Sequence, residues 1–339
     1  MILAGDVGGT KCNLALFEVN GASHRKVIDF RYQSRDFLLF DQIISKFLVD
    51  ARDALKEAGP RGIEAAGFGV AGPVIEGRVK TTNLPWIVDA AEVASRVNTK
   101  HVVLLNDLEA TGHSLAHLAP SELSTLNRGV EAPRATRALL AAGTGLGEAI
   151  LFWDGAGYVV ASTEGGHSDF PPRTEWEIEL LRYMKKQHPY VSVELILSGR
   201  GFRAIHLFLN PSVQHASFES AEEDAAAPEI TRLGLAGECP VCVQTLDLWV
   251  SMYGSEAGNL ALKTLARGGV WVAGGIAVKI RKKMEDGTFF HAFCEKEKFA
   301  ALLAQIPVRM VLNEEAPLIG AMSQAVRAAG IANASASNF

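Results

Sequence analysis

The chain has 339 residues, 48% of them hydrophobic and 21% charged, and its 33 basic and 38 acidic side chains give a formal net charge of −5. This length favours two domains in a folded globular protein, and the small acidic excess gives no electrostatic reason to expect nucleic acid or an anionic membrane as a partner. No apolar run reaches the roughly 18 residues that span a bilayer, the first residues lack a secretory signal, and four cysteines make no disulfide framework, so we expect a cytoplasmic protein.

The first half of the chain alternates predicted strands and helices. Two apolar strands within residues 1–16 are joined so closely by a glycine-rich turn that they are expected to form a hairpin. The elements expected after this hairpin are a strand at 26–32, a helix at 38–57, a strand at 63–70, a helix at 89–97, a strand at 102–105 and a helix from Leu108. This alternation predicts an α/β domain.

The opening pattern recurs after a polar, turn-rich stretch at 120–137, which we interpret as a domain boundary. The expected elements of the second half are strands at 139–142, 149–152 and 158–161 around a glycine turn at 143–147, helices at 175–186, 194–209 and 239–266, an acidic alanine-rich surface loop at 221–228, a strand, turn and helix at 268–276, and a last helix at 317–329. Two copies of strand, glycine turn, strand, strand predict a duplicated domain that holds a ligand between the copies.

Both glycine turns could bind phosphate. Residues 5–11, Gly-Asp-Val-Gly-Gly-Thr-Lys, are not a Walker A loop, and residues 143–147, Gly-Thr-Gly-Leu-Gly, are not a dinucleotide fingerprint. In both turns, bare backbone beside a threonine would let N–H groups and a hydroxyl converge on phosphate oxygens. Asp6 could hold Mg²⁺ through water. The alternative is a pair of tight hairpins with a capping Asp, which the duplication disfavours.

Two polar motifs follow predicted strands. Asp107 comes directly after the strand at 102–105, where α/β sheets place ligand contacts, and could act as a general base beside Asn106. An N-cap explains the same pair equally well. Glu164 and His167, separated by two glycines, could bind a polyol or form a loop with a helix cap, and they are too few for a catalytic zinc.

Three further features are interpreted as structural. Ser192 is the expected N-cap of a helix that carries Glu194 in its first turn. Cys239 and Cys242 form a single Cys-x-x-Cys pair, whereas a zinc ribbon needs two, so we expect ordinary cysteines at a helix start. Four histidines have no partners at catalytic spacing and are also expected to be structural, namely His101, His113, His117 and His206.

Four of these motifs resemble those of the bacterial glucokinase family, in its order and spacing. They are Gly5-Asp6-Val7-Gly8-Gly9-Thr10, Asn106-Asp107-Leu108-Glu109-Ala110, Gly143-Thr144-Gly145-Leu146-Gly147 and Thr163-Glu164-Gly165-Gly166-His167, and Val272-Ala273-Gly274-Gly275-Ile276 is similar to the family's adenosine-side motif. The C-x-C-G-x-x-G-C zinc motif of the related ROK (repressor/kinase) sugar kinases is absent. The resemblance implies an actin-like, ribonuclease H-like ATPase fold, with two α/β domains of duplicated topology, each with a five-stranded sheet, around a cleft.

The resemblance also implies a reaction, which is the ATP-dependent phosphorylation of D-glucose on its 6-hydroxyl group, the first step of glycolysis. It further implies Mg²⁺ as cofactor and a homodimer. We expect a small domain at 1–118 plus 315–330, a large domain at 119–314 and a disordered tail at 331–339. The alternatives are a kinase for another hexose, such as fructose, mannose or an amino sugar, and a non-catalytic sugar sensor.

Carried over position by position, the resemblance gives each motif a role. Asp107 would be the general base, and Glu194 changes from a presumed capping residue to a sugar ligand. The residues expected to contact glucose are Asn106, Asp107, Glu164, His167, Glu194 and Asn83. The residues expected to bind ATP are Gly5, Asp6, Val7, Gly8, Gly9, Thr10, Gly143, Thr144, Gly145, Gly147, Gly274 and Gly275.

Overall fold

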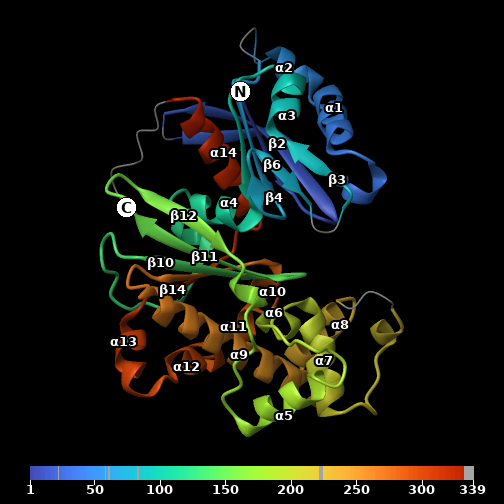
Figure 1. Ribbon diagram of the computed structural model, residues 1–339, viewed down its shortest axis with the longest axis vertical. Coiled ribbons are helices and arrows are strands. Elements are labelled where there is room, and N and C mark those ends of the chain that lie inside the picture. Colours follow the sequence, from blue (N-terminus) through green and yellow to red (C-terminus); the bar gives the residue numbers. More distant parts are fainter. Residues whose placement is uncertain (22, 58, 60–61, 82–83, 221–223, 332–339) are drawn as a thin grey trace. The chain divides into compact units, whose positions relative to one another are not determined.

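The computed structural model describes residues 1–21, 23–57, 59, 62–81, 84–220 and 224–331 (Figure 1). The chain separates into two compact units, each with its own sheet. Unit 1 comprises Met1–Pro120, Trp153–Ala161 and Asn313–Phe339, and unit 2 comprises Ser121–Phe152 and Ser162–Leu312. Of the tail expected at 331–339, only Ile331 is among the described residues.

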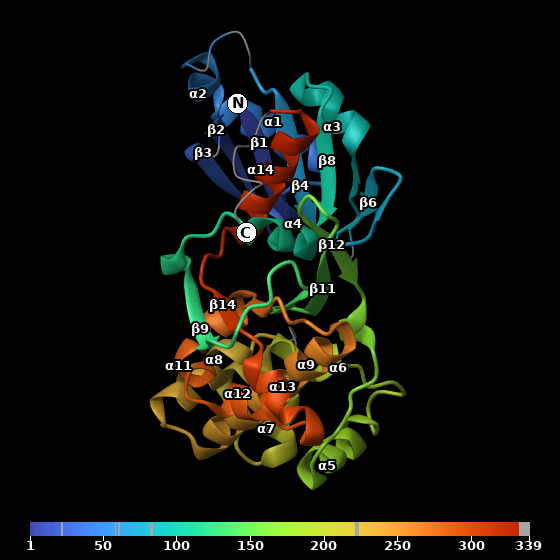
Figure 2. The ribbon, with the colours of Figure 1, turned by 90° about the vertical axis from the view of Figure 1, so that its left-hand side faces the viewer.

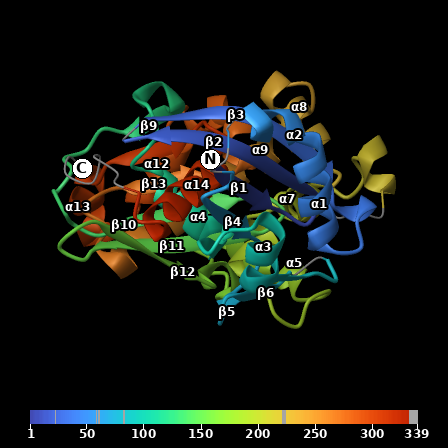
Figure 3. The ribbon, with the colours of Figure 1, turned by 90° about the horizontal axis from the view of Figure 1, so that it is seen from above.

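Unit 1 is built on a five-stranded sheet of order β3-β2-β1-β4-β8, in which β2 runs antiparallel to its neighbours and β1, β4 and β8 are parallel. Figure 3 shows β1, β2 and β3 side by side. The strands of unit 1 are β1 (Ile2–Val7), β2 (Lys11–Asn20), β3 (Ser23–Gln33), β4 (Ala65–Val70) and β8 (Val102–Asn106), with a small separate sheet of β5 (Val74–Ile75), β6 (Arg78–Lys80) and β7 (Ile87–Asp89). The helices are α1 (Phe40–Asp50), α2 (Arg52–Glu57), α3 (Ala90–Val97), α4 (Asp107–Ser114) and α14 (Ala316–Ala328), preceded in chain order by the 3₁₀ turn η1 (Ser34–Asp36).

The side chains of β1 alternate between two apolar cores on opposite faces of this sheet. Leu3 joins the core that contains Phe47 of α1 and Phe68 of β4, whereas Ile2 and Ala4 join the core formed with α14. Figures 1 and 2 show α14 on one face of the sheet and α1 and α3 on the other. Because a register slip of one residue would exchange the two faces, this burial on both sides fixes the strand pairing.

The second sheet has six strands in the order β12-β11-β10-β13-β14-β9, and its residues belong to unit 2 except Trp153 of β11 and 158–161 of β12. Figure 3 shows β10, β11 and β12 as neighbours. Its strands are β9 (Leu123–Asn127), β10 (Arg137–Ala142), β11 (Leu146–Trp153), β12 (Tyr158–Thr163), β13 (Val270–Ala273) and β14 (Val308–Val311). The strands β10, β13 and β14 are parallel, and β11 runs antiparallel to β10.

The two sheets repeat one topology, as the motifs predicted. The order β3-β2-β1-β4-β8 in unit 1 corresponds to β12-β11-β10-β13-β14 in unit 2. The expectation of five strands in each sheet is wrong for unit 2, because β9 adds a sixth strand, antiparallel to β14. This strand lies within the stretch at 120–137 that was interpreted as a boundary. Its sequence, Leu-Ser-Thr-Leu-Asn, carries little apolar signal, since an edge strand is held mainly by backbone pairing.

The helices of unit 2 surround α9, whose middle is buried. They are α5 (Glu175–Met184), α6 (Val193–Ile196), α7 (Gly199–Leu209), α8 (Ala227–Ala236), α9 (Pro240–Thr264), α10 (Gly275–Lys279), α11 (Arg281–Met284), α12 (Thr288–Cys294) and α13 (Ala300–Gln305), with short 3₁₀ turns η3 (Pro120–Glu122), η4 (Gly165–His167), η5 (Ala216–Glu219) and η6 (Glu297–Phe299). None of the helices that the structure describes combines the length and the apolar character needed to cross a membrane.

Three predicted segments differ from the structure. The helix expected at 38–57 is divided into α1 and α2 at Ala51, and the helix expected at 194–209 is divided into α6 and α7. The second division arises because the Gly199 N–H donates to the Gly143 carbonyl at 2.9 Å and so draws the start of α7 to the glycine turn. The expectation of a surface loop at 221–228 is wrong for the end of this segment, because Ala226 and Ala227 are buried at the start of α8. Residues 221–223 lie outside the described residues.

Glu148 of β11 is a buried carboxyl group with an incomplete set of partners. Its side chain is 2% exposed, and its Oε1 atom has no hydrogen-bond partner among the described residues. Burial and, second, the nearby Glu256 carboxylate raise the pKa of Glu148 to about 7, and Lys263 opposes the shift. The protonated form of this side chain is therefore more favoured in the folded protein than in the unfolded chain.

We expect the free energy of unfolding to fall as pH rises from 4.5 to about 7, because the unfolded chain releases the Glu148 proton at lower pH than the folded chain. In Glu148→Gln this contribution is absent. The stability of the variant relative to wild type should therefore increase by on the order of 3 kcal/mol across this window, at about 1.4 kcal/mol per pKa unit. Urea unfolding at several pH values measures the difference, with Glu57→Gln on the exposed end of α2 as control. A difference that is independent of pH would contradict the prediction.

Candidate active site

The first glycine turn joins β1 to β2 and is held by a residue that the motif does not contain. The Gly8 N–H donates to the Lys11 carbonyl at 3.0 Å, which closes the turn. Ser34, which is fully buried, donates its hydroxyl to the Gly8 carbonyl at 2.9 Å and its N–H to the Thr10 carbonyl at 3.0 Å. Sequence reasoning missed Ser34, because it lies more than 20 residues after the turn and carries no local motif.

Asp6 lies at the end of β1 in an acidic environment. Burial and, second, the Asp107 carboxylate raise the pKa of Asp6 to about 6. The Asn13 amide, which donates to Asp6 Oδ2 at 3.3 Å, and Arg31 oppose the shift. Two carboxylates this close attract a hard cation, and oxygen ligands are those that Mg²⁺ takes. The donor set at Asp6 and Asp107 therefore fits a magnesium ion held through water.

The Asn106-Asp107 pair starts α4, where one residue is the N-cap and the other is the first helical residue. Asn106 is the N-cap, since its Oδ1 accepts from the Leu108 N–H at 3.0 Å and its Nδ2 donates to the Gly72 carbonyl at 3.3 Å. Asp107 is the first helical residue and its Oδ1 also accepts from the Leu108 N–H, at 2.9 Å. The cap is thus supplied by Asn106, and Asp107 stands in the first turn of the helix beside Asp6.

A glycine lets α4 approach β4, the strand that pairs with β1 beside Asp6. Gly69 of β4 registers with Asp6 of β1. A Cβ atom at Gly69 would lie 2.9 Å from the Ala110 Cβ and 3.6 Å from the Asp107 Cα. A larger residue would displace the first turn of α4, so this glycine sets the distance between Asp107 and Asp6.

In unit 2, Glu194 is tied to the second glycine turn. Ser192 is the N-cap of α6, as predicted, and its Oγ accepts from the Leu195 N–H at 3.3 Å. Glu194 Oε2 accepts from the Leu146 N–H at 3.0 Å, and its Oε1 accepts from Arg200 at 2.7 Å. Glu194 therefore braces the turn at 143–147. Arg200 is a second residue that sequence reasoning missed, because only the fold brings it to Glu194.

The loop of Glu164 and His167 lies against the same turn. A Cβ atom at Gly166 would be 2.1 Å from the Leu146 carbonyl oxygen, which confirms that this loop needs glycine for close backbone approach. Glu164 Oε2 and His167 Nε2 are 3.8 Å apart, and both side chains are exposed. The Tyr190 hydroxyl donates to the His167 carbonyl at 2.5 Å and holds the end of the loop. The loop thus presents one carboxylate and one imidazole to solvent.

The Gly274-Gly275 turn between β13 and α10 meets the end of β10. Gly274 has φ = +91°, and a Cβ atom there would lie 2.4 Å from the Ala142 carbonyl oxygen. Ala142 directly precedes the turn at 143–147, so the two glycine turns of unit 2 are neighbours. Only glycine satisfies both the backbone angle and the close approach.

The structure therefore gathers the predicted residues into two groups, one in each unit. Unit 1 holds the turn at 5–10 with Asn106 and Asp107, and unit 2 holds the turn at 143–147 with Glu164, His167, Glu194 and the Gly274-Gly275 turn. Asn83 lies outside the described residues. One expectation is wrong, because His206 does have partners: its Nε2 atom lies 3.2 Å from His215 Nε2, beside Cys239 and Cys242.

Known proteins resemble the chain over nearly its whole length. The family model described as Glucokinase matches residues 3–328. A glucokinase of Nostoc sp. is 38% identical over 347 residues, an alignment that covers 96% of this chain and 99% of the relative. The two proteins therefore align along almost their entire length.

Solved structures give the same result for the fold. The glucokinase from an Antarctic psychrotroph superposes with a TM-score of 0.81 at 28% identity and covers 96% of this chain and 98% of its own. A ROK family glucokinase from Streptomyces griseus, solved in complex with glucose and AMPPNP, gives a TM-score of 0.59 at 20% identity and covers 96% and 99%. The fold is thus the actin-like ATPase fold that the motifs implied, and the chain belongs to the glucokinase family.

Proposed function

We infer that this protein transfers the γ-phosphoryl group of ATP to the 6-hydroxyl group of D-glucose and so forms glucose 6-phosphate, the first step of glycolysis. The observation that supports this most directly is Asp107, which stands in the first turn of α4 beside Asp6 and the turn at 5–10. A hydroxyl group bound at Asp107 would lie near the turn at 5–10, which is the proposed phosphate-binding turn of unit 1. The name of the Nostoc relative, glucokinase, supports glucose as that acceptor.

Asp107 is the proposed general base. An ionised carboxylate can hold the 6-hydroxyl in line with the γ-phosphorus and accept its proton as the new O–P bond forms. Phosphoryl transfer needs positioning and charge stabilisation more than covalent chemistry. The Asn106 cap supports this role, because it fixes the start of α4 and therefore the position of the Asp107 side chain.

The three glycine turns are the proposed nucleotide contacts. The turns at 5–10 and 143–147 would bind phosphate oxygens through their backbone N–H groups, and Gly274-Gly275 would bind the adenosine. A Mg²⁺ ion, held through water by Asp6, would offset negative charge on the phosphates when bound. The bound AMPPNP of the Streptomyces griseus structure supports a nucleotide of this type.

The proposed sugar contacts are the polar residues that the family resemblance implies. The proposed contacts are Asn106 and Asp107 at the start of α4, and Glu164, His167 and Glu194 near the turn at 143–147. Because Glu194 already accepts from the Leu146 N–H and from Arg200, its remaining lone pairs would face the sugar while it braces the phosphate turn. This coupling would link sugar binding to the position of the turn at 143–147. Asn83 is retained as a further candidate.

The alternative functions are a kinase for another hexose and a non-catalytic sugar sensor. The names of the relatives do not favour either. A sensor would have no need for the Asp107 carboxylate. We further propose a cytoplasmic location, where ATP is available, and a homodimer, as the family resemblance implies. Size-exclusion chromatography with light scattering tests the oligomeric state directly.

A coupled assay for sugar phosphate with ATP and Mg²⁺ tests the proposed function across glucose, fructose, mannose and N-acetylglucosamine. We expect a clear preference for glucose. Preference for another hexose would overturn the substrate and keep the mechanism. ATP binding without turnover on any of the four sugars would overturn the catalytic function.

Asp107→Asn should lower kcat by roughly 10²–10⁴-fold, the usual contribution of a general base. The amide keeps the size and the hydrogen-bonding reach of the side chain, so glucose binding measured by calorimetry should persist. Asp53→Asn, at a highly exposed position of α2, is the matched control and should leave kcat unchanged. Near-normal turnover of Asp107→Asn would remove this residue from its proposed role.

Glu164→Gln and His167→Ala should raise the KM for glucose by on the order of 10-fold, since a sugar hydroxyl that loses its partner costs about 1–3 kcal/mol. The KM for ATP is the internal control and should change little, because neither side chain belongs to a glycine turn. Steady-state kinetics with each substrate varied in turn separates the two effects. An unchanged glucose KM in both variants would rule out the proposed sugar contacts.

A further inference from the structure

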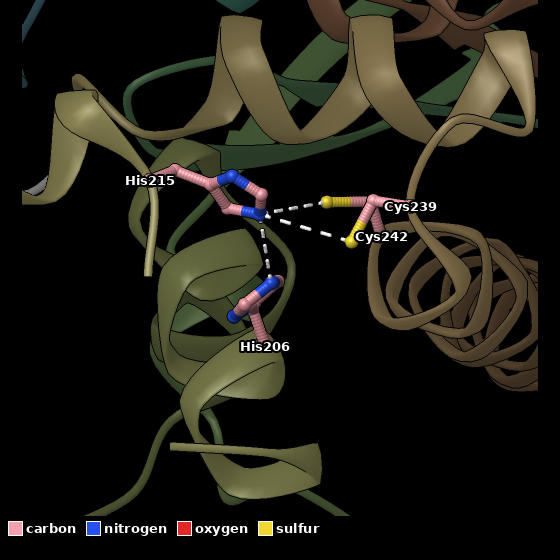
Figure 4. Close-up of side chains that lie close together, drawn as sticks. All are labelled: His206, His215, Cys239 and Cys242. Atoms are coloured by element: carbon pink, nitrogen blue, oxygen red, sulfur yellow. Dashed lines mark hydrogen bonds between the residues drawn. The ribbon is translucent and has the colours of Figure 1, made fainter. Parts of the chain in front are cut away.

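Four metal-binding side chains that the proposed reaction does not use converge in unit 2. His206 comes from α7, His215 from the segment before η5, Cys239 is the N-cap of α9, and Cys242 lies in the first turn of α9. Their nearest ligand atoms all lie within 4.8 Å of one another. Figure 4 shows the four side chains directed at one common point.

Hydrogen bonds alone do not account for this convergence. His215 Nε2 lies 3.2 Å from His206 Nε2, 3.3 Å from Cys242 Sγ and 3.9 Å from Cys239 Sγ. One ring nitrogen either donates a single proton or accepts through a single lone pair, so it cannot form three good hydrogen bonds at once. A cation at the centre would give all four atoms the same partner.

The three separations measured from His215 Nε2 agree with tetrahedral zinc. Zn–N bonds of about 2.0–2.1 Å and Zn–S bonds of about 2.3 Å, arranged tetrahedrally, place two nitrogens about 3.4 Å apart and a nitrogen and a sulfur about 3.6 Å apart. The observed N···N distance is 3.2 Å, and the observed N···S distances are 3.3 and 3.9 Å. These values deviate from the ideal edges by only a few tenths of an ångström.

The charge and the softness of the donors also select zinc. Two thiolates balance the charge of a divalent ion, and two neutral imidazoles complete the shell, so the site can be buried without net charge. His206 and Cys242 are fully buried. Hard ions such as Mg²⁺ prefer oxygen ligands, whereas sulfur and imidazole together favour zinc.

We propose that His206, His215, Cys239 and Cys242 bind one structural Zn²⁺ ion. All four positions of the tetrahedron are filled by protein, which leaves none open for catalysis. The ion would fasten the chain between α7 and α9, including η5 and α8, to the start of α9. The spacing, His-x₈-His-x₂₃-Cys-x₂-Cys, is not that of the C-x-C-G-x-x-G-C motif, so this is a different site.

The surrounding packing orients both histidine rings. The ring centroids of His206 and His215 lie 5.0 and 5.4 Å from that of Phe218 of η5, each in an edge-to-face arrangement. Pro240 at the first position of α9 fixes the backbone between the two cysteines. The ligands are therefore held by two helices and an aromatic contact, so little reordering would accompany metal binding.

Metal analysis of the full-length protein tests the proposal. Protein purified under reducing conditions, without chelator, should contain about one zinc per chain by inductively coupled plasma mass spectrometry. Cys242→Ser and His215→Ala should each lose most of it, because a hydroxyl or a methyl group does not replace the lost ligand. Cys294→Ser changes a free cysteine outside the cluster and is the matched control. Zinc-free wild-type protein, or equal zinc in all variants, would overturn the proposal.

Two further measurements on the wild-type protein do not depend on the folding of variants. Co²⁺ added to metal-free protein should give thiolate charge-transfer absorption and the visible bands of a tetrahedral ion, and Zn²⁺ should displace it. Removal of zinc should lower the Tm by several degrees, and Zn²⁺ but not Mg²⁺ should restore it. A Cys239–Cys242 disulfide found by mass spectrometry under native conditions, or a Tm that is indifferent to zinc, would refute the site.

Discussion

Close approach of one chain segment to another at a few glycines is the constraint on which both groups of candidate site residues depend. Gly69 lets the first turn of α4 reach the end of β1, and Gly166 lets the loop of Glu164 and His167 rest on Leu146. At each position a single methyl group would meet an atom at 2.9 Å or less. Protein interiors are close-packed, so these contacts cannot be relaxed without moving the elements that carry the functional side chains.

The carboxylates of the two groups of candidate site residues have different electrostatic environments. In unit 1, burial and the repulsion of the Asp107 carboxylate raise the pKa of Asp6 to about 6. That cost is compatible with a site that receives Mg²⁺, because a cation removes the repulsion. In unit 2, the Glu194 carboxylate is paired with the Arg200 guanidinium and accepts from the Leu146 N–H. The acidic residues of unit 1 therefore favour binding of a cation, whereas the Glu194 carboxylate of unit 2 is held in place by its own partners.

The duplicated sheets explain why both units carry a glycine turn at the end of a central strand. In each unit a glycine turn joins two antiparallel strands, β1 to β2 and β10 to β11, and a parallel strand lies on the other side of β1 and of β10. The units then diverge in their insertions. Unit 2 places α5 to α9 between β12 and β13, and this insertion carries both Glu194 and the His206–Cys242 cluster. A metal ion in that cluster would stabilise the part of the fold that has no counterpart in unit 1.

The sequence by itself determined the family, the duplicated α/β pattern and the position of each motif on a strand end or turn. These features are local, since glycine turns, helix caps and apolar periodicity depend on residues only a few positions apart. Only the tertiary structure decided that Ser34 holds the first turn, that Arg200 holds Glu194 and that β9 extends the second sheet. It also decided that two histidines join the single Cys-x-x-Cys pair. Such partners are separated by up to about 180 residues, as β9 and β14 are, and they meet because the packing of distant elements brings them together. No pattern within one segment of sequence records that packing.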